Sequence, residues 1–483
     1  MVLPSLEPKK VFEFFEYLSS VPHGSGNTKA VSDLCVDFAR EHGLEWYQDD
    51  SNNVIIKKPA TKGYENAPAL ILQGHLDMVC AKEPDDPTDM SKVPIKLAVD
   101  GDWIHAVGTS LGGDDGIAVA MALAVLDSDT LKHPALECVF TTDEETGMFG
   151  AVALDCSKLN GKRMLNLDSE EEGMLTCGCS GGARVNCDIS AERADEGENA
   201  VRYFVKLGGL IGGHSGGDID KGRANANKLL ARFLYTAAEQ LDIRLVAMHG
   251  GKFDNVITTE ATAEISLPSS QKAAFEALAH AYDGIYKNEY SASDAGVFLT
   301  AEKTDGTVAP VTAEDTARIL TALILLPQGV QEMSMDIKGL VQTSLNLGIL
   351  TLDDGDFHCS FAVRSSILTQ KEMLITRVKA AVEAVGGTVT VSSAYPGWQF
   401  AKVSPIRDIV ADVFAEVYGK PAGITATHGG LECGLFIEKI PGLDAVSFGP
   451  DLRDIHSVRE RMSAASVKRM YDALVKILER CDK

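Results

Sequence analysis

The chain alternates short apolar runs with longer segments in which apolar residues recur every three or four positions. Val11, Phe14, Phe15 and Leu18 show the second pattern, which predicts an amphipathic helix. Short apolar runs are typical of strands buried on both faces of a parallel sheet. Together they predict an α/β fold in which helices flank a mostly parallel sheet. The expected strands are 53–57, 69–73, 136–141, 164–167 and 444–448, and the expected helices are 6–20, 28–42, 117–126, 404–418 and one that Ser463 caps and that ends near 480.

The middle of the chain has a different pattern, with longer alternating strands and well-separated amphipathic helices. Residues 340–349 and 357–363 predict neighbouring antiparallel strands, and a helix is expected at 369–385. At 483 residues the chain is longer than a single core usually supports. We therefore expect an α+β domain inserted into the α/β domain. The predicted segments are 1–181, 182–396 and 397–483.

The composition of the chain argues against some classes of binding partner. The chain has 45 basic and 69 acidic residues and a net charge of -24, which argues against binding nucleic acid or anionic lipid. No apolar stretch reaches the roughly 18 residues of a membrane span, and the N-terminal sequence lacks the apolar core of a signal peptide. The ten cysteines include no Cys-x-x-Cys pair. We expect a cytoplasmic protein with reduced thiols and no thiolate zinc site.

The first candidate for chemistry follows the apolar run at 70–72. Gly74 ends that run, and His75 and Asp77 follow it one residue apart. In an extended chain these two side chains point the same way. A carboxylate beside an imidazole can orient it as a metal ligand, although a capped turn would show the same residues.

Four further loops carry acidic residues or histidine. Asp114 and Asp115 lie in a Gly-rich turn before an apolar helix, where either N-capping or metal binding would use them. Glu144 and Glu145 follow another strand and face opposite ways, so one could bind a metal while the other reaches a water; the pattern does not say which. Asp168 follows the strand at 164–167, and His456 follows the strand at 444–448.

In an open parallel sheet such loops converge beyond the carboxyl ends of the strands. Two histidines and three carboxylates there suit two Zn²⁺ ions that share one carboxylate, and Mn²⁺ or Co²⁺ would also accept these ligands. Two such ions, about 3.5 to 4 Å apart, hold a hydroxide and polarise a carbonyl group. A free carboxylate can then move protons, so the pattern favours amide hydrolysis.

Six motifs make the case specific: GHLDMV, GTSLGGDDGIAVA, TTDEETG, LNLDSE, GGHSGGDI and GPDLRDIHS. Their order resembles the Xaa-His dipeptidases, also called aminoacyl-histidine dipeptidases or peptidase D. These belong to the dinuclear zinc peptidase superfamily that includes carboxypeptidase G and aminoacylase. The resemblance implies that His75 and Asp168 hold one zinc, that Glu145 and His456 hold the other, and that Asp114 bridges the two.

The same resemblance assigns the remaining catalytic roles. Asp77 would orient His75, and Glu144 would be the general base. The inserted domain would be a lid whose His214, in GGHSGGDI, helps to stabilise the oxyanion. A solvent-exposed histidine in a flexible Gly loop is the alternative for His214.

Asn255, Arg364 and Gly430 match positions that contact substrate in the family. The planar guanidinium of Arg364 suits the free carboxylate of a short peptide, although an ordinary surface ion pair would also explain an arginine there. The chain departs from the family at Asp115, where many relatives have Asn, and at Gly429, where relatives often have Ala. Neither departure removes a ligand.

The sequence thus predicts a two-zinc enzyme that hydrolyses dipeptides, with Xaa-His substrates such as carnosine preferred. The alternatives are a broader dipeptidase or tripeptidase, an amino-acid deacylase, or a non-catalytic metal-binding relative, against which the complete ligand set argues. We expect a homodimer. A duplicated lid would supply His214 within one chain, whereas a simple lid would need a partner subunit to supply it.

Overall fold

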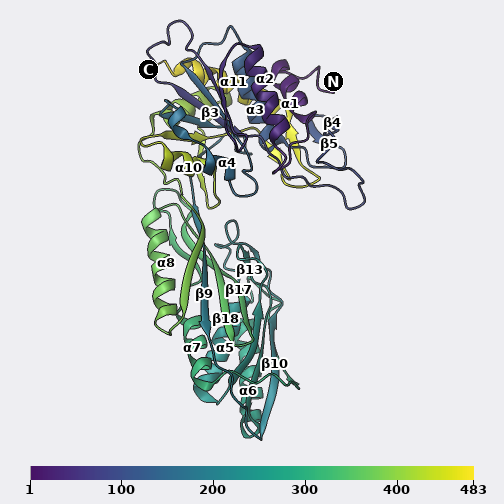
Figure 1. The fold of residues 1–483 in the computed structure, drawn as a ribbon, viewed down its shortest axis with the longest axis vertical. Coiled ribbons are helices and arrows are strands. Elements are labelled where there is room, and N and C mark those ends of the chain that lie inside the picture. The colour runs from purple at the N-terminus through teal and green to yellow at the C-terminus, as the bar shows by residue number, and fades with distance from the viewer. Residues whose placement is uncertain (1, 483) are drawn as a thin grey trace. The chain divides into compact units, whose positions relative to one another are not determined.

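The computed structural model describes residues 2–482, which form two compact units (Figure 1). The first unit comprises Met1–Cys179, Phe400–Ala426 and Leu431–Lys483. The second comprises Ser180–Gln399 and the short return Thr427–Gly430. The chain therefore leaves the first unit after Cys179 and rejoins it at Phe400. It then contributes residues 427–430 to the second unit before it completes the first. The predicted boundaries placed residues 427–430 in the first domain, with the rest of 397–483.

The first unit is built on an eight-stranded sheet with the order β1-β2-β6-β3-β7-β21-β8-β20. Its centre is parallel, since β3 pairs in parallel with both β6 and β7, and β21 pairs in parallel with β7. All six residues of β3 are buried, as expected for a strand covered on both faces. The strands are β1 Glu45–Gln48, β2 Val54–Lys58, β3 Leu70–His75, β6 Leu136–Thr141, β7 Arg163–Asn166, β8 Met174–Cys179, β20 Gly423–Thr427 and β21 Asp444–Ser447.

Helices cover this sheet and share its apolar core. Helix α3 is apolar around its whole circumference because it packs between β3 and α1. Ser463 caps α11 by accepting a hydrogen bond from the N–H of Ser466, as predicted. The helices are α1 Lys9–Ser19, α2 Lys29–Glu41, α3 Gly113–Asp127, α4 Phe149–Ala153, α9 Pro405–Tyr418, α10 Glu432–Lys439 and α11 Ala464–Arg480.

A small four-stranded sheet in the same unit has the order β22-β23-β5-β4. Its strands are β4 Leu97–Asp100, β5 Trp103–Ala106, β22 Leu452–Arg453 and β23 Arg461–Ser463. The hairpin between β22 and β23 spans residues 454–460 and carries His456. Pairing of β23 with β5 holds the base of this hairpin.

The second unit contains a nine-stranded sheet in which the paired strands are antiparallel. Helices α5 to α8 pack against it (Figure 1). The strands are β9 Gly181–Ser190, β10 Ala200–Gly208, β12 Arg244–Gly250, β14 Ala261–Pro268, β15 Phe298–Thr304, β16 Gly329–Met333, β17 Val341–Asp353, β18 Asp356–Ser365 and β19 Thr388–Tyr395, and a separate ribbon joins β11 Gly213–His214 to β13 Val256–Ile257. The helices are α5 Ala226–Gln240, α6 Lys272–Glu289, α7 Ala313–Leu325 and α8 Leu368–Glu383.

The predicted fold class is confirmed: a mostly parallel sheet with helices is interrupted by an α+β insertion built on an antiparallel sheet. Across residues 2–482, no helix has the length and apolar content that crossing a bilayer requires.

Candidate metal centre

The predicted ligands of the first unit meet at the carboxyl ends of neighbouring parallel strands. His75 is the last residue of β3, Glu145 lies just after β6, and Asp168 lies just after β7. Asp114 stands at the start of α3, and His456 comes from the hairpin between β22 and β23. Residues that are far apart in the chain therefore form one cluster.

Asp114 lies at the centre of this cluster. Its Oδ1 is 3.3 Å from His75 Nε2, and its Oδ2 is 3.2 Å from His456 Nε2. Each histidine also faces a second carboxylate: His456 Nε2 is 2.9 Å from Glu145 Oε1, and His75 Nε2 is 3.9 Å from Asp168 Oδ1. The arrangement is that of one shared carboxylate between two histidine–carboxylate pairs.

The donor set fits divalent cations. Ligand atoms of His75, Asp114 and Glu145 lie within 4.8 Å of one another, and so do those of His75, Asp115 and Asp168. Glu145 Oε1 is buried and accepts no hydrogen bond of acceptable geometry, although it lies close to His456. A buried carboxylate oxygen without a donor is costly unless a cation takes it up. Nitrogen and oxygen donors without thiolate suit Zn²⁺, Mn²⁺ or Co²⁺.

The electrostatics of the cluster also favour cations. The hydrogen bond with Asp114 and the nearby carboxylate of Glu145 raise the pKa of His456 to about 10. Burial by itself would lower the pKa of His75, but Asp114 and Asp77 raise it well above its usual value. Burial raises the pKa of Asp168 well above the ordinary carboxyl range. Bound protons thus offset the negative charge of the crowded carboxylates. Divalent ions would displace these protons on binding and offset the same charge.

Asp77 and Glu144 lie beside the cluster. His75 Nδ1 is 2.9 Å from the backbone oxygen of Asp77 and 3.5 Å from its carboxylate Oδ1, so the backbone oxygen is the nearer partner. The Asp77 carboxylate instead accepts hydrogen bonds from the N–H groups of Glu144 at 3.0 Å and Glu145 at 3.3 Å, and from Ser25 Oγ at 2.7 Å. Asp77 therefore supports the loop after β6 as well as His75. Burial raises the pKa of Glu144 to about 7.

The aspartate pair does not cap α3 with its side chains. Asp114 and Asp115 have non-helical backbone angles, and the peptide bond between them is cis. Asp115 Oδ2 accepts a hydrogen bond from the N–H of His75 at 3.1 Å. The N–H groups at the start of the helix are bound instead by Glu460, a residue that the sequence analysis did not single out.

A second residue missed from the sequence is Glu432, at the start of α10. Its Oε2 accepts hydrogen bonds from Gln73 Nε2 at 2.6 Å and from Thr141 Oγ1 at 2.7 Å. Asn166 donates in turn to Gln73, so this buried network joins β3, β6 and β7 near their carboxyl ends. Burial raises the pKa of Glu432 to about 8, and nearby Glu144 adds to the shift. In the sequence, Glu432 could have been singled out by its position in a Gly-rich segment before a short helix.

The other predicted site residues belong to the second unit. His214 ends β11 and is exposed, and its Nδ1 accepts a hydrogen bond from the N–H of Gly216 at 3.2 Å. Partial burial and the charge of Arg364 lower the pKa of His214. The backbone oxygen of Asn255 accepts a hydrogen bond from the N–H of Ser215 at 2.8 Å, so His214 and Asn255 lie on neighbouring segments.

Arg364 lies close to the return segment that holds Gly430. Its Nη1 is 3.5 Å from the backbone oxygen of His428 and 3.5 Å from the hydroxyl of Tyr395. Its Nε is buried without a hydrogen-bond partner among the described residues. Such loosely paired guanidinium donors are suited to an incoming carboxylate.

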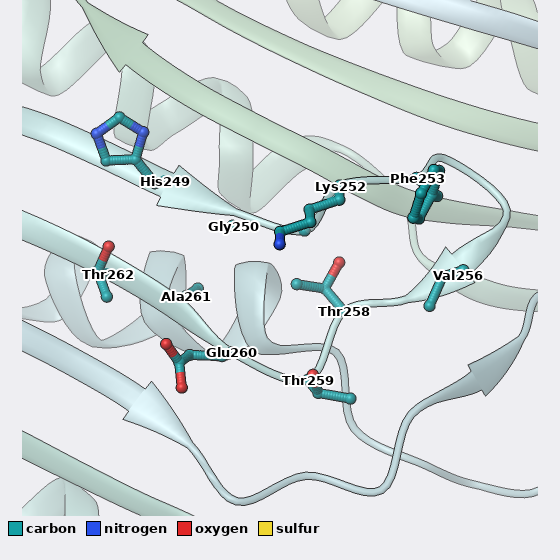
Figure 2. Close-up of a pocket in the computed structure, with 11 residues that line it drawn as sticks. His249, Gly250, Lys252, Phe253, Val256, Thr258, Thr259, Glu260, Ala261 and Thr262 are labelled. Atoms are coloured by element: carbon teal, nitrogen blue, oxygen red, sulfur yellow. The ribbon is translucent and has the colours of Figure 1, made fainter. Parts of the chain in front are cut away.

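A hollow of about 410 Å³ lies elsewhere in the second unit. Figure 2 shows the residues that line it. Residues 249–253, 256 and 258–262 line it, on β12, β14 and the segment between them. None of the predicted site residues lines it. Its threonines, Lys252 and Glu260 offer no ligand cluster comparable with the one around Asp114.

Residues 71–480 match the peptidase family M20/M25/M40 over most of the chain, including all the predicted ligands. The chain belongs to peptidase family M20/M25/M40. The predictions of a peptidase and of the wider superfamily are therefore confirmed. Members of this family typically hold two metal ions, in agreement with the cluster around Asp114.

Two known proteins are similar to this chain over almost its full length. The chain is 36% identical over 477 residues to the cytosol non-specific dipeptidase of Escherichia coli K12, covering 99% of this chain and 98% of the relative. The crystal structure of aminoacylhistidine dipeptidase from Vibrio alginolyticus superposes with a TM-score of 0.94 at 37% identity, covering 99% and 98% of the two chains. The resemblance found in the motifs is thus confirmed. Aminopeptidase PepT from Bacillus cereus, at 17% identity and a TM-score of 0.57 over 99% of this chain, shares the fold.

Proposed function

We propose that this protein is a two-zinc dipeptidase that cleaves unblocked dipeptides and prefers Xaa-His substrates such as carnosine. The observation that carries the proposal is the position of the Asp114 carboxylate between His75 and His456. Family membership and the names of both full-length relatives support a dipeptide substrate. The name of the Escherichia coli relative, a cytosol non-specific dipeptidase, supports a cytoplasmic location and also favours a broader dipeptidase as the second candidate.

The proposed ligands divide into two sets that share Asp114. His75 and Asp168 would hold one ion, and Glu145 and His456 would hold the other. Mn²⁺ or Co²⁺ could replace Zn²⁺ on these donors. When bound, the pair of ions would lower the pKa of a shared water and polarise the scissile carbonyl group.

Glu144 is proposed as the general base. It takes a proton from the attacking water and later gives it to the leaving amine. A pKa of about 7, caused by burial, suits a group that must both accept and donate a proton near neutral pH. Asp77 orients His75 and holds the backbone of Glu144, so it fixes the base relative to the ligands.

The inserted domain, predicted as 182–396, is proposed to act as the lid, with 1–181 and 397–483 as the catalytic domain. His214 donates to the developing oxyanion, and Arg364 binds the carboxylate of the peptide. Asn255 and Gly430 complete the substrate contacts. We also keep the prediction of a homodimer.

A substrate panel tests this proposal. The metal-loaded protein is assayed with β-Ala-His, Ala-His, Leu-Gly, Gly-Gly-Gly and N-acetyl amino acids. The highest kcat/KM is expected for the two Xaa-His dipeptides. Equal rates on Leu-Gly would favour the broader dipeptidase, and cleavage of the acetylated substrates alone would exclude a dipeptidase.

A further inference from the structure

The carboxylate of Glu460 binds four consecutive backbone N–H groups of the loop that leads into Asp114. Its Oε2 accepts hydrogen bonds from Leu111 at 2.7 Å and Gly112 at 3.0 Å. Its Oε1 accepts hydrogen bonds from Gly113 at 2.8 Å and Asp114 at 3.2 Å. Glu460 is only 3% exposed. Since hydrogen bonds to a buried carboxylate are stronger than those between neutral groups, this contact restrains the loop tightly.

The glycines of the loop make the contact possible. Gly112 has a φ of 68°, which favours glycine, and as the residue before α3 it has no side chain to cap the helix. A Cβ on Gly113 would lie 2.9 Å from Leu452 Cδ2 and 3.3 Å from Glu460 Oε1. The loop therefore has both the backbone angles and the space that let one distant carboxylate take the place of a local cap.

Glu460 belongs to the hairpin that carries His456. It immediately precedes β23, where Arg461 pairs with His105 of β5 and Met462 pairs with Leu452 of β22. The base of the hairpin is thus fixed by strand pairing. Through Glu460, the same hairpin is bonded to the segment that carries Asp114.

We propose that Glu460 is a positioning residue of the metal centre, which holds the Asp114 loop and the His456 hairpin at the spacing that two metal ions require. The proposal rests on the proposed function, because it assumes that Asp114 and His456 are ligands. Glu460 touches neither substrate nor metal in this role. It acts through the backbone of one ligand and through the hairpin of another.

The test is a titration of the metal-free protein with Co²⁺ alone, followed by visible absorption, for the wild type, Glu460→Gln and Glu460→Asp. Gln turns an amide NH₂ toward backbone donors, and Asp is one methylene too short to reach all four. Loss of a residue that supports ligands typically weakens metal binding about 10- to 100-fold. We expect a decrease of that size and an altered cobalt spectrum in both variants.

Glu137→Gln is the matched control. Glu137 is also 3% exposed, and it also binds loop backbone, accepting hydrogen bonds from the N–H groups of Asn160 at 2.9 Å and Gly161 at 2.9 Å. It lies near the start of β6, whereas the ligand loop follows the end of that strand. This variant should lose thermal stability but keep the wild-type cobalt affinity and spectrum.

Wild-type cobalt binding in folded Glu460→Gln and Glu460→Asp would overturn the proposal. An equal loss of affinity in Glu137→Gln would also overturn it, because the effect would then reflect general destabilisation. Circular dichroism checks that each variant is folded, and if Glu460→Gln does not fold, Glu460→Asp decides. If the wild type binds two Co²⁺ but cleaves no dipeptide, the proposed function fails while the cobalt result for Glu460 still stands.

Discussion

His456 Nε2 lies 3.2 Å from Asp114 Oδ2, although 342 positions separate the two residues. Asp114 lies at the start of a helix that packs against the central sheet, and His456 is carried by a hairpin of the small sheet. The contact therefore joins the first and the last segment of the first unit. It is also the relationship on which a shared metal ligand depends.

The variants Asp114→Asn and Asp115→Asn should distinguish the roles of the two adjacent aspartates. Asp114 faces both histidines, so its amide would weaken both metal sites and lower activity by about 100-fold or more. Asp115 serves as an acceptor for the N–H of His75, a task that an amide oxygen can perform. We expect Asp115→Asn to keep its metal content and activity within about threefold. Metal analysis and steady-state kinetics check both variants, and the reverse ranking would contradict the assignment of Asp114.

Glu144→Gln should retain near-normal metal content and lose turnover. Gln has a similar shape but cannot take a proton from water, and general base catalysis typically contributes about 10²- to 10⁴-fold. The decrease should appear in kcat, with little change in KM. Metal analysis gives the metal content of the variant, and steady-state kinetics with Ala-His gives its kcat and KM. Wild-type activity in this variant would contradict the role of Glu144 as the base.

Removal of metal should abolish hydrolysis without unfolding the sheets. Dialysis against a chelator is expected to reduce activity to background, because His75, Asp114 and Glu145 alone cannot polarise a carbonyl group. Zn²⁺, Co²⁺ or Mn²⁺ should restore it. Circular dichroism before and after dialysis provides the control. Full activity in protein shown to be free of metal would exclude the metal-dependent mechanism.

Arg364→Lys should weaken the binding of peptides with a free carboxylate. Lysine keeps the charge but cannot form two parallel hydrogen bonds to a carboxylate. A hydrogen bond to a charged group is worth about 1.5 to 3 kcal/mol, so KM should increase roughly 10- to 100-fold. The amide Ala-His-NH₂ is the control substrate, since its kcat/KM should change little. An equal effect on both substrates would assign Arg364 to general support of the site.

His428 should make the stability of the protein depend on pH. It is 8% exposed, its Nε2 is 2.7 Å from Ser344 Oγ, and burial together with nearby Arg364 lowers its pKa to about 4. Below pH 6.5 the unfolded chain takes up a proton that the folded chain refuses, so this contribution to stability is complete above pH 6.5 and is lost as the pH falls toward 4. The loss at pH 5 should be about 2 kcal/mol.

Urea unfolding of the wild type and His428→Gln at pH 7.5 and pH 5 measures this difference. Other groups titrate in the same range, but they are common to both proteins. The wild type should therefore lose more stability than the variant on acidification. Equal losses would show that His428 is protonated in the folded protein.

The sequence predicted which residues of the first unit would cluster because each follows a local signal. His75 and Asp168 come directly after apolar runs that become β3 and β7, and the loops beyond parallel strands must converge. Pattern alone left Glu144 and Glu145 equivalent, since both lie in one turn. In the structure Glu145 contacts His456, while burial raises the pKa of Glu144.

The supporting residues could not be predicted in the same way. Glu460 lies between Arg459 and Arg461, a charged stretch that reads as solvent-exposed surface. Only the tertiary fold brings it to the N–H groups before α3. The strands β1 and β8 were also missed; β1 is partly exposed and β8 has no strong apolar alternation, so both depend on pairing with neighbours.

The first unit is completed only by its last segment, Leu431–Lys483, after the whole second unit has been made. A ribosome therefore releases β3, β6 and β7, with the proposed ligands that follow them, long before it releases His456 and Glu460. Until then the nascent chain holds four of the five proposed metal ligands, without His456. Under the proposed ligand set, peptide hydrolysis requires the hairpin that holds His456, and a truncated product that lacks this hairpin should be inactive even if its central sheet has folded.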